Sequence, residues 1–335
     1  MYIFNDYVHI YLYMKHILVT GGCGFIGSNF INNHFEQNGF QDTHIVNLDA
    51  LYYCANVLNV TEKIRKSKYY TFIQGNITNH ELVNSILHTY KIDIVIHFAA
   101  QSHVQDSFTD PGKYVQDNIL GTHTLLEACR THGNITRFIH ISTDEVYGES
   151  LIADEEQKTE QSILCPTNPY AATKASAELL ASSYYHSFKF PIIITRGNNV
   201  YGPNQYPEKL IPKFIELLRN GKKVTIQGDG SNVRGFLHVQ DVAQAIEHVV
   251  KKGVIGEIYN IGSDVHDEYT VMQIAEKLIV LIHPETKSKE EHIEYIEDRP
   301  FNDKRYFISN EKIKKLGWNI TIPFESGLKD LVQNH

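Results

Sequence analysis

Short runs of apolar residues alternate with helical patterns through about the first 200 residues of this chain. The apolar runs that we predict to be buried strands are His16–Thr20, His44–Leu48, Tyr69–Ile73, Asp93–His97, Arg137–Ser142 and Pro191–Arg196. Continuous apolar strands separated by helical segments are typical of a parallel sheet that helices cover on both faces. The pattern therefore predicts an α/β fold with a Rossmann-type doubly wound parallel sheet.

The pattern becomes irregular beyond Asn198, where loops rich in glycine, proline and asparagine interrupt it. Helical spacing returns at Leu210–Arg219 and at Val239–Lys251. We interpret this half as a smaller α/β region that is interwoven with the sheet. Residues 1–13 precede the first predicted strand. We expect either that Met14 is the functional start or that residues 1–13 form a loosely ordered N-terminal extension.

The composition argues against several classes of function. Of the 335 residues, 42% are hydrophobic and 21% are charged, which is ordinary for a globular protein. The net charge of −8 disfavours a nucleic-acid or anionic membrane partner, and no stretch approaches the ~20 apolar residues of a membrane span. The 18 histidines include no HExxH-like pair of ligands, so we expect no metal site. The cysteines are scattered, as reduced thiols of a cytoplasmic protein are: Cys23, Cys54, Cys129 and Cys165.

A glycine-rich turn follows the first predicted strand and precedes a helical pattern. Gly21, Gly24 and Gly27 allow a tight turn and the close approach of a pyrophosphate to a helix N-terminus. Asp49 ends the second strand, where its carboxylate can accept hydrogen bonds from both ribose hydroxyls, so we predict NAD rather than NADP. The other cofactor contacts that we expect are Phe25, Ile26, Asn76, Ile77, Ala99, Ala100 and Gln101.

A hydroxyl and two adjacent carboxylates, Thr143, Asp144 and Glu145, follow the fifth predicted strand. Adjacent carboxylates repel each other and resist desolvation, so their presence at a strand's carboxyl end indicates function. Tyr170 and Lys174 are spaced to share one face of a helix. We expect the ammonium group to lower the pKa of the phenol, which would make Tyr170 a base near neutral pH, and to hold the nicotinamide ribose.

Together these motifs resemble those of the extended short-chain dehydrogenase/reductases, and more narrowly of the nucleotide-sugar 4,6-dehydratases. The matching segments are Gly21–Gly27, Ser142–Gly148, Tyr170–Lys174, Asn198–Pro203, Pro207–Pro212 and Asp298–Pro300. They extend from about Met14 almost to the C-terminus. Sugar epimerases of the same superfamily share the glycine and YxxxK motifs but usually lack the two acids, so Asp144 and Glu145 favour a dehydratase.

The resemblance implies an ordered set of roles. Tyr170, aided by Thr143, takes the proton of the glucose 4-hydroxyl while a hydride passes to NAD. Glu145 removes the C5 proton, Asp144 protonates the departing C6 hydroxyl, and NAD is regenerated in each turnover. The implied substrate contacts are Ser102, Thr143, Asn199, Lys209, Leu210, Arg234 and Arg299.

The resemblance also implies a domain organisation and an assembly. Residues 14–197 would form the NAD-binding Rossmann domain, and residues 198–335 mainly the nucleotide-sugar-binding region, with about 236–262 returning to the first domain. The helical runs Tyr114–Arg130 and Ala171–Phe188 resemble those that pair subunits in this superfamily, so we expect a homodimer.

The identity of the sugar nucleotide remains open at this point. Bacterial dTDP-glucose dehydratases usually carry Glu where this chain has Gln101 and Asp where it has Gln105. The resemblance is closer to UDP-glucose dehydratases, the first domain of plant-type rhamnose synthases, so we favour UDP-glucose and its product UDP-4-keto-6-deoxyglucose. The alternatives are a dTDP-glucose 4,6-dehydratase, a UDP-sugar 4-epimerase or decarboxylase, and a non-enzymatic NAD-sensing protein. Uracil and thymine differ by one methyl group, which is worth only ~1–3 kcal/mol in an apolar pocket.

Overall fold

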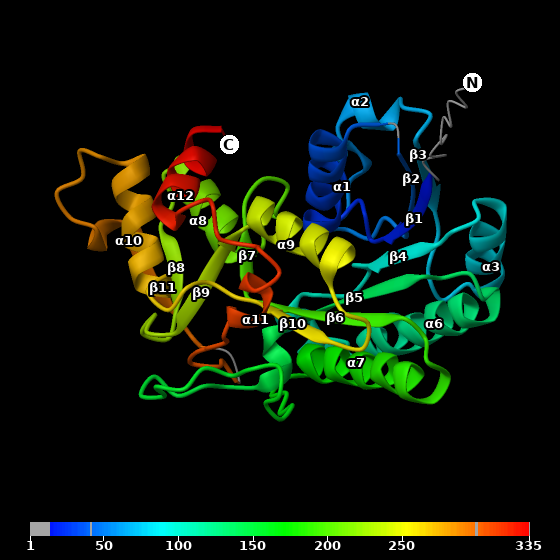
Figure 1. Cartoon of the computed structure of the whole chain (residues 1–335). Coiled ribbons are helices and arrows are strands. Elements are labelled where there is room, and N and C mark those ends of the chain that lie inside the picture. The colour runs from blue at the N-terminus through cyan, green and yellow to red at the C-terminus, as the bar shows by residue number, and fades with distance from the viewer. Residues whose placement is uncertain (1–13, 41, 299–300, 335) are drawn as a thin grey trace, which may run out of the picture.

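A seven-stranded parallel sheet forms the centre of the larger part of the molecule (Figure 1). The computed structural model describes residues 14–40, 42–298 and 301–334, so the predictions for residues 1–13 and for Arg299 lie outside it. The strand order is β10-β6-β5-β4-β1-β2-β3. The strands are β1 (Lys15–Thr20), β2 (Thr43–Asp49), β3 (Tyr70–Gln74), β4 (Ile94–His97), β5 (Arg137–Thr143), β6 (Ile192–Gly197) and β10 (Ile258–Ile261). All six predicted strands are therefore confirmed, each end within one residue, and so is the doubly wound α/β class.

Helices cover both faces of this sheet, as Figure 1 shows. Helices α1 (Phe25–Asn38) and α9 (Val239–Lys252) pack side by side on one face. Helices α3 (His80–Thr89), α6 (Gly121–His132) and α7 (Pro169–Phe188) cover the other. Shorter elements connect them: η1 (Val57–Asn59), α2 (Glu62–Arg65), α4 (Val104–Thr109), α5 (Pro111–Tyr114) and the π-helical η2 (Val115–Leu120).

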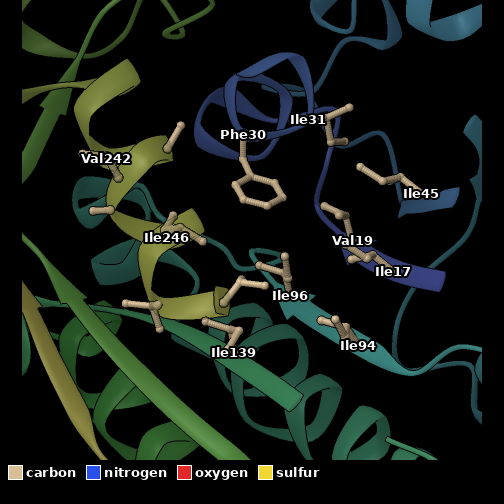
Figure 2. Close-up of a cluster of buried hydrophobic side chains, with 14 of the residues drawn as sticks. Ile17, Val19, Phe30, Ile31, Ile45, Ile94, Ile96, Ile139, Val242 and Ile246 are labelled. Carbon is tan, nitrogen blue, oxygen red and sulfur yellow. The ribbon is translucent and has the colours of Figure 1, made fainter. Parts of the chain in front are cut away.

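The core under α1 and α9 shows how the sheet is sealed on its first face (Figure 2). Phe30 from α1 and Ile246 from α9 are fully buried against Val19, Ile96 and Ile139 of the strands beneath them. Burying an aliphatic or aromatic side chain of this size stabilises the fold by about 1.5–3 kcal/mol. The packing holds the N-terminus of α1 directly beyond the carboxyl end of β1.

The second half of the chain builds a smaller region with its own core (Figure 1). It contains two small sheets, β11-β9-β7 and β12-β8. Their strands are β7 (Asn199–Tyr201), β8 (Val224–Gln227), β9 (Val233–His238), β11 (Glu268–Thr270) and β12 (Ile293–Ile296). The helices are α8 (Leu210–Arg219), α10 (Val271–Ile282), α11 (Glu311–Lys314) and α12 (Phe324–Asn334), with a short η4 (Glu290–His292).

The two predicted helices of this half are confirmed as α8 and α9, whereas its short strands were not predicted. Between β9 and β11, which pair in one of the small sheets, the chain returns to the large sheet as α9 and β10, and β10 pairs with β6. The division into two domains stays a prediction. Across the described residues, no helix is both long enough and apolar enough to cross a membrane.

Candidate active site

The glycine turn between β1 and α1 can be built only with glycine at two positions. Gly21 has a φ of +74°, and a Cβ on it would lie 2.6 Å from the backbone nitrogen of Ala99. A Cβ on Gly27 would lie 2.4 Å from the carbonyl oxygen of Gly21. Gly24 is the N-cap of α1 and supplies no capping side chain, so the N–H groups of the first turn face outward. This is the arrangement that binds a pyrophosphate at a helix N-terminus.

A cavity opens beside this turn, at the carboxyl ends of β1, β2, β4 and β5. It brings together every predicted cofactor residue: Gly21, Gly24, Phe25, Ile26, Gly27, Asp49, Asn76, Ile77, Ala99, Ala100, Gln101, Tyr170 and Lys174. Ser102 and Lys209, predicted as substrate contacts, also line it. Residues that the sequence reasoning missed complete the wall: Tyr52, Cys54, Asp117, Gln205, Tyr206 and Glu208.

Asp49 occupies the position expected of a ribose-binding carboxylate. It is buried, and its two oxygens accept hydrogen bonds of 2.8 Å from the backbone N–H groups of Cys23 and Leu51. Burial raises the pKa of the Asp49 carboxyl. Each oxygen keeps a further lone pair, so the carboxylate can still accept a hydrogen bond from a ribose hydroxyl.

Gln101 is tied to a carboxylate on the π-helical segment η2. Its Nε2 donates to Asp117 Oδ2 over 2.7 Å, and Tyr52 donates its hydroxyl to the other oxygen over 3.2 Å. Asn76 donates in turn to the Tyr52 hydroxyl over 2.8 Å. A glutamate in place of Gln101 would set two carboxylates against each other, so the amide suits the Asp117 of this chain.

Tyr170 and Lys174 lie on one face of α7, as predicted, but the expected effect of the lysine on the tyrosine is wrong. Lys174 donates from Nζ to the carbonyl oxygen of Ile141 on β5 over 2.6 Å. Burial raises the pKa of Tyr170, and the charges of Glu145 and Asp144 raise it further. Burial also lowers the pKa of Lys174 to about 8. Burial and the charges of the two carboxylates therefore favour the neutral phenol, and the ammonium of Lys174 is directed at the strand instead.

The strand β5 ends at Thr143, and the chain turns at once into the short 3₁₀ helix η3 (Asp144–Tyr147). Thr143 is the N-cap of η3, and its hydroxyl accepts a hydrogen bond from the backbone N–H of Glu145 and donates to Asp144 Oδ1 over 3.1 Å. The same hydroxyl lies close enough to Tyr170 to lower the pKa of its phenol. Along a continued strand, Asp144 and Glu145 would point to opposite faces. The turn removes that alternation and lets both acids lie near Tyr170.

The two acids have different surroundings. Asp144 is 3% exposed, and burial together with the neighbouring charge of Glu145 raises its pKa to about 7. Asn198 opposes this rise by donating from Nδ2 to Asp144 Oδ2 over 2.6 Å. Glu145 is partly buried, and burial raises its pKa, while a 2.9 Å hydrogen bond from Asn168 lowers it. Such a pair can supply a proton donor and a proton acceptor at neutral pH.

Arg234 on β9 is oriented by main-chain oxygens of the C-terminal segment. It donates to the carbonyl oxygens of Asp303 and Lys304 over 2.7 and 3.2 Å, and its guanidinium lies 4.8 Å from the ring centre of Tyr306. Its charge lowers the pKa values of both acids, so it lies within electrostatic reach of them. Four predicted substrate contacts are not among the residues that line the cavity: Thr143, Asn199, Leu210 and Arg234.

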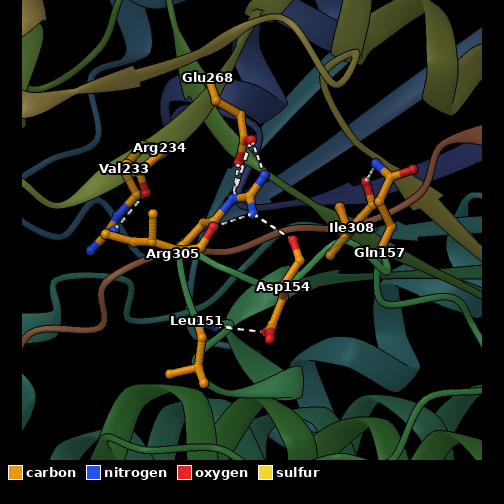
Figure 3. A network of polar contacts seen from close by, with 9 residues as sticks. Leu151, Asp154, Gln157, Val233, Arg234, Glu268, Arg305 and Ile308 are labelled. Atoms are coloured by element: carbon orange, nitrogen blue, oxygen red, sulfur yellow. Dashed lines mark hydrogen bonds and ion pairs between the residues drawn. The ribbon is translucent and has the colours of Figure 1, made fainter.

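Arg305 fastens this C-terminal segment to two others, as Figure 3 shows. Its guanidinium forms an ion pair with Glu268 of β11 and donates to the carbonyl oxygen of Asp154 over 3.0 Å. The loop that follows η3 also bonds the segment directly, through Gln157 and the carbonyl oxygen of Ile308. This side of the site is therefore assembled from chain segments that are far apart in the sequence.

Three residues near the acids were missed by sequence reasoning: Asn168, Asn198 and Asp303. Asn198 lay inside a motif that matched the family, and Asn168 directly precedes Pro169 at the start of α7, which is a typical helix N-cap. No local signal marked Asp303, since two of its partners, Thr167 and Arg234, come from distant parts of the chain.

The fold, the glycine turn and the Thr143–Tyr170–Lys174 arrangement define an extended short-chain dehydrogenase/reductase. The chain belongs to the GDP-mannose 4,6 dehydratase family, whose model matches residues 18–331. It is 48% identical over 322 residues to a trifunctional UDP-glucose 4,6-dehydratase/UDP-4-keto-6-deoxy-D-glucose 3,5-epimerase/UDP-4-keto-L-rhamnose-reductase of Arabidopsis thaliana. That match covers 95% of this chain and 47% of the relative, so the chain spans about half the length of that protein.

Two further comparisons cover nearly the whole of both chains. The human dTDP-D-glucose 4,6-dehydratase is 46% identical over 324 residues, covering 96% of this chain and 90% of that protein. The crystal structure of a dTDP-glucose 4,6-dehydratase from Streptomyces venezuelae, with NAD bound, has a TM-score of 0.88 at 35% identity. It covers 95% of this chain and 96% of that one.

Proposed function

We propose that this protein catalyses the NAD-dependent 4,6-dehydration of a nucleotide-activated glucose. The observation that carries the proposal is the pair Asp144 and Glu145 at the turn after β5, beside Thr143 and Tyr170. The two carboxyls are held by different amides, and the more deeply buried one has a pKa raised to about 7. Loss of water across C5 and C6 needs one group to take a proton and another to give one, which is what this pair can do.

NAD would be held along the cavity by this chain's own residues. The glycine turn and the N-terminus of α1 would receive the pyrophosphate, Asp49 the adenosine ribose, and Lys174 the nicotinamide ribose. The small side chains of Ala99 and Ala100 leave room between these contacts. When bound, NAD supplies the acceptor for a hydride from C4 of the sugar and the donor that returns it to C6.

The protein residues then divide the proton transfers. Tyr170, beside Thr143, would take the proton of the 4-hydroxyl as C4 becomes a ketone. It would do so as the phenolate, which the positive charges of Lys174 and of the nicotinamide ring would favour over the neutral phenol once NAD is bound. The ketone acidifies the C5 proton, which Glu145 removes, and Asp144 protonates the C6 hydroxyl so that it leaves as water. Glu145 finally returns a proton to C5. Asp144 is suited to the acid role because its raised pKa keeps the carboxyl protonated near neutral pH.

The proposed substrate is UDP-glucose, and the product UDP-4-keto-6-deoxyglucose, a step towards rhamnose or another deoxysugar. The support is the 48% identity to the Arabidopsis protein, together with the amide of Gln101 that suits Asp117. dTDP-glucose is the alternative, since relatives that act on it are almost as similar. The proposed substrate contacts are Ser102, Thr143, Asn199, Lys209, Leu210, Arg234 and Arg299.

The test is to incubate the purified protein with UDP-glucose and with dTDP-glucose, without added NAD. We expect a 4-keto-6-deoxy product, co-purified NAD and no net accumulation of reduced cofactor. Stoichiometric reduced cofactor, or a product that is only UDP-galactose, would refute the proposal. The ratio of the kcat/KM values for the two substrates shows whether the enzyme prefers the uracil or the thymine nucleotide.

We further propose a homodimer that forms through α7 and the run Tyr114–Arg130, which contains η2 and most of α6. What supports this is a set of exposed apolar side chains on these helices: Val115, Leu120, Leu179 and Phe188. Leu179→Asp should therefore yield a monomer in light scattering, and an unchanged dimer would contradict the assignment.

The proposed location is the cytoplasm, because Cys23, Cys54, Cys129 and Cys165 are all free thiols.

A further inference from the structure

Another buried carboxylate, that of Asp303, lies near Glu145. It is 3% exposed and accepts a hydrogen bond from the Thr167 hydroxyl, at 2.8 Å from Oδ1 and 3.0 Å from Oδ2. Tyr306 donates its hydroxyl to Oδ2 over 2.5 Å. The charge of Asp303 raises the pKa of Glu145, so the two carboxylates lie within electrostatic reach of each other. A buried charge costs much free energy unless it is paired or hydrogen-bonded, and the Thr167 and Tyr306 hydroxyls supply hydrogen bonds here.

The contact with Thr167 leads directly to Glu145. Asn168, the next residue, uses both ends of its side-chain amide. Its Oδ1 accepts from the backbone N–H of Ala171 over 2.8 Å and so caps α7, while Nδ2 donates to Glu145 Oε2 over 2.9 Å. Because both ends are engaged, the orientation of the amide depends on the backbone at 167 and 168. Asp303 anchors that backbone through Thr167.

We infer that Asp303 is a positioning residue, which acts through Thr167 and Asn168 to hold the Glu145 carboxylate where it removes the C5 proton. The inference rests on the proposed dehydration. Asp303 does not need to touch the sugar in this role. Displacement of a catalytic group by about 1 Å can lower a rate by 100-fold, so a contact two residues removed can govern the step.

The chain around Asp303 also contacts the residues proposed to bind the charged nucleotide of the substrate. Arg234 donates to the carbonyl oxygen of Asp303, and Asn232 does so over 3.1 Å. Asp303, which helps to position the catalytic base Glu145, therefore also orients Arg234, the arginine proposed to bind the nucleotide. A change confined to Thr167 leaves these main-chain contacts in place, and so separates placement of the base from binding.

The test uses the whole protein with its co-purified cofactor and three variants. Thr167→Val removes the hydroxyl with little change of shape, Thr167→Ser restores a hydroxyl, and Asp303→Asn removes the charge but keeps the size. Thr136→Val is the matched control. Thr136 directly precedes β5, at the opposite end of that strand from Thr143, and its hydroxyl donates to the carbonyl oxygen of Asp93. Each protein is assayed for deuterium uptake at C5 from heavy water, for bound reduced cofactor during turnover, and for thermal stability.

We expect Thr167→Val and Asp303→Asn to lower C5 exchange by about 10- to 100-fold, and reduced cofactor to accumulate because oxidation at C4 continues. Thr167→Ser and Thr136→Val should stay within about threefold of the natural protein. If oxidation and C5 exchange fall in parallel, or if Thr167→Val leaves exchange unchanged, the inference is wrong. If Asp303→Asn does not fold, Thr167→Val decides alone. If the natural protein forms no 4-keto-6-deoxy product, the proposed function itself fails.

Discussion

Asn198 donates from its side-chain nitrogen to Asp144 Oδ2 over 2.6 Å, at a point where the carboxyl is almost completely buried. The other end of the same amide accepts a hydrogen bond from the backbone N–H of Ser263 over 2.9 Å. This fixes the direction of the amide, so that Asp144 always faces the donor. A donor stabilises the ionised carboxylate, which opposes the effect of burial. The balance leaves the pKa of Asp144 at about 7, inside the range in which it can exchange protons with a substrate.

Removal of that donor should change the pH dependence of the reaction. The proposed role of Asp144 requires the protonated carboxyl, so kcat/KM should fall as the pH rises through about 7. In Asn198→Ala the ionised form loses its hydrogen bond, the pKa rises, and this basic limb should move upward by about one pH unit. The measurement is a pH profile of kcat/KM for both proteins. A downward shift of the limb would contradict the role of Asn198.

Glu145→Gln should stop the exchange of the C5 proton with solvent. Loss of a general base lowers the rate of its step by about 10²- to 10⁴-fold, whereas oxidation at C4 relies on Tyr170 and Thr143 and should persist. Deuterium uptake at C5, followed by mass spectrometry, measures the step. Glu149→Gln is the matched control, because this next acid in the chain accepts a hydrogen bond from the Lys304 backbone N–H away from Tyr170. Exchange at the natural rate in Glu145→Gln would show that another group is the base.

The raised pKa of Asp144 also predicts a pH-dependent cost to stability. The folded protein holds this proton from the ordinary carboxyl pKa of 3.8 up to about 7, while the unfolded chain releases it. The contribution of Asp144 to the free energy of unfolding is therefore greatest at low pH. It declines as the pH rises between those two pKa values, by ~1.4 kcal/mol for each pH unit.

Asp144→Asn removes the titrating group and should therefore unfold at a higher temperature than the natural protein at pH 8. Below pH 4 the two should differ much less. Thermal unfolding at several pH values tests this, with the exposed Asp42→Asn as control. A difference between Asp144→Asn and the natural protein that does not vary with pH would contradict the assignment.

The sequence predicted the large sheet and many of the residues that line the cavity, because these features are encoded locally. Strands such as β1 are continuous apolar runs, and the glycine spacing is written within seven residues, Gly21–Gly27. The strands β7 and β11 have three residues each and carry no recognisable period, so they were missed. Their pairing depends on β9, which reaches both of them only in the folded chain.

The contacts that tune the acids could not be predicted for a related reason. Asn168 and Asn198 lie 23 and 54 residues from the carboxyls that they hold, and Thr167 lies 136 residues from Asp303. Likewise, helical spacing showed that Tyr170 and Lys174 share a face, but not that the ammonium is directed at Ile141. Motif spacing identifies which groups are present, while their pKa values depend on burial and on partners from distant segments.

A buried ion pair between Arg196 and Glu178 should matter more for stability than any exposed pair. Arg196 is 3% exposed and Glu178 is 1% exposed, and Arg196 Nε donates to Glu178 Oε1 over 2.9 Å. Arg196 Nη1 also donates to the Tyr147 hydroxyl over 2.6 Å. The pair therefore joins β6, α7 and η3, one helical turn beyond Lys174. Removing one partner leaves an uncompensated buried charge, so Arg196→Met should lower the free energy of unfolding by about 3–5 kcal/mol.

The double variant Arg196→Met with Glu178→Leu removes both charges, so it should be less destabilised than the sum of the two single variants. Chemical denaturation of all four proteins gives this coupling. The exposed pair Lys66–Glu62 is the control, and Lys66→Met should change stability by less than about 1 kcal/mol. Additive losses at Arg196 and Glu178 would mean that the charges do not compensate each other. Non-additive losses at Arg196 and Glu178 would confirm the coupling. If the single variants also retain less NAD, the ion pair supports α7, the helix that carries Tyr170 and Lys174.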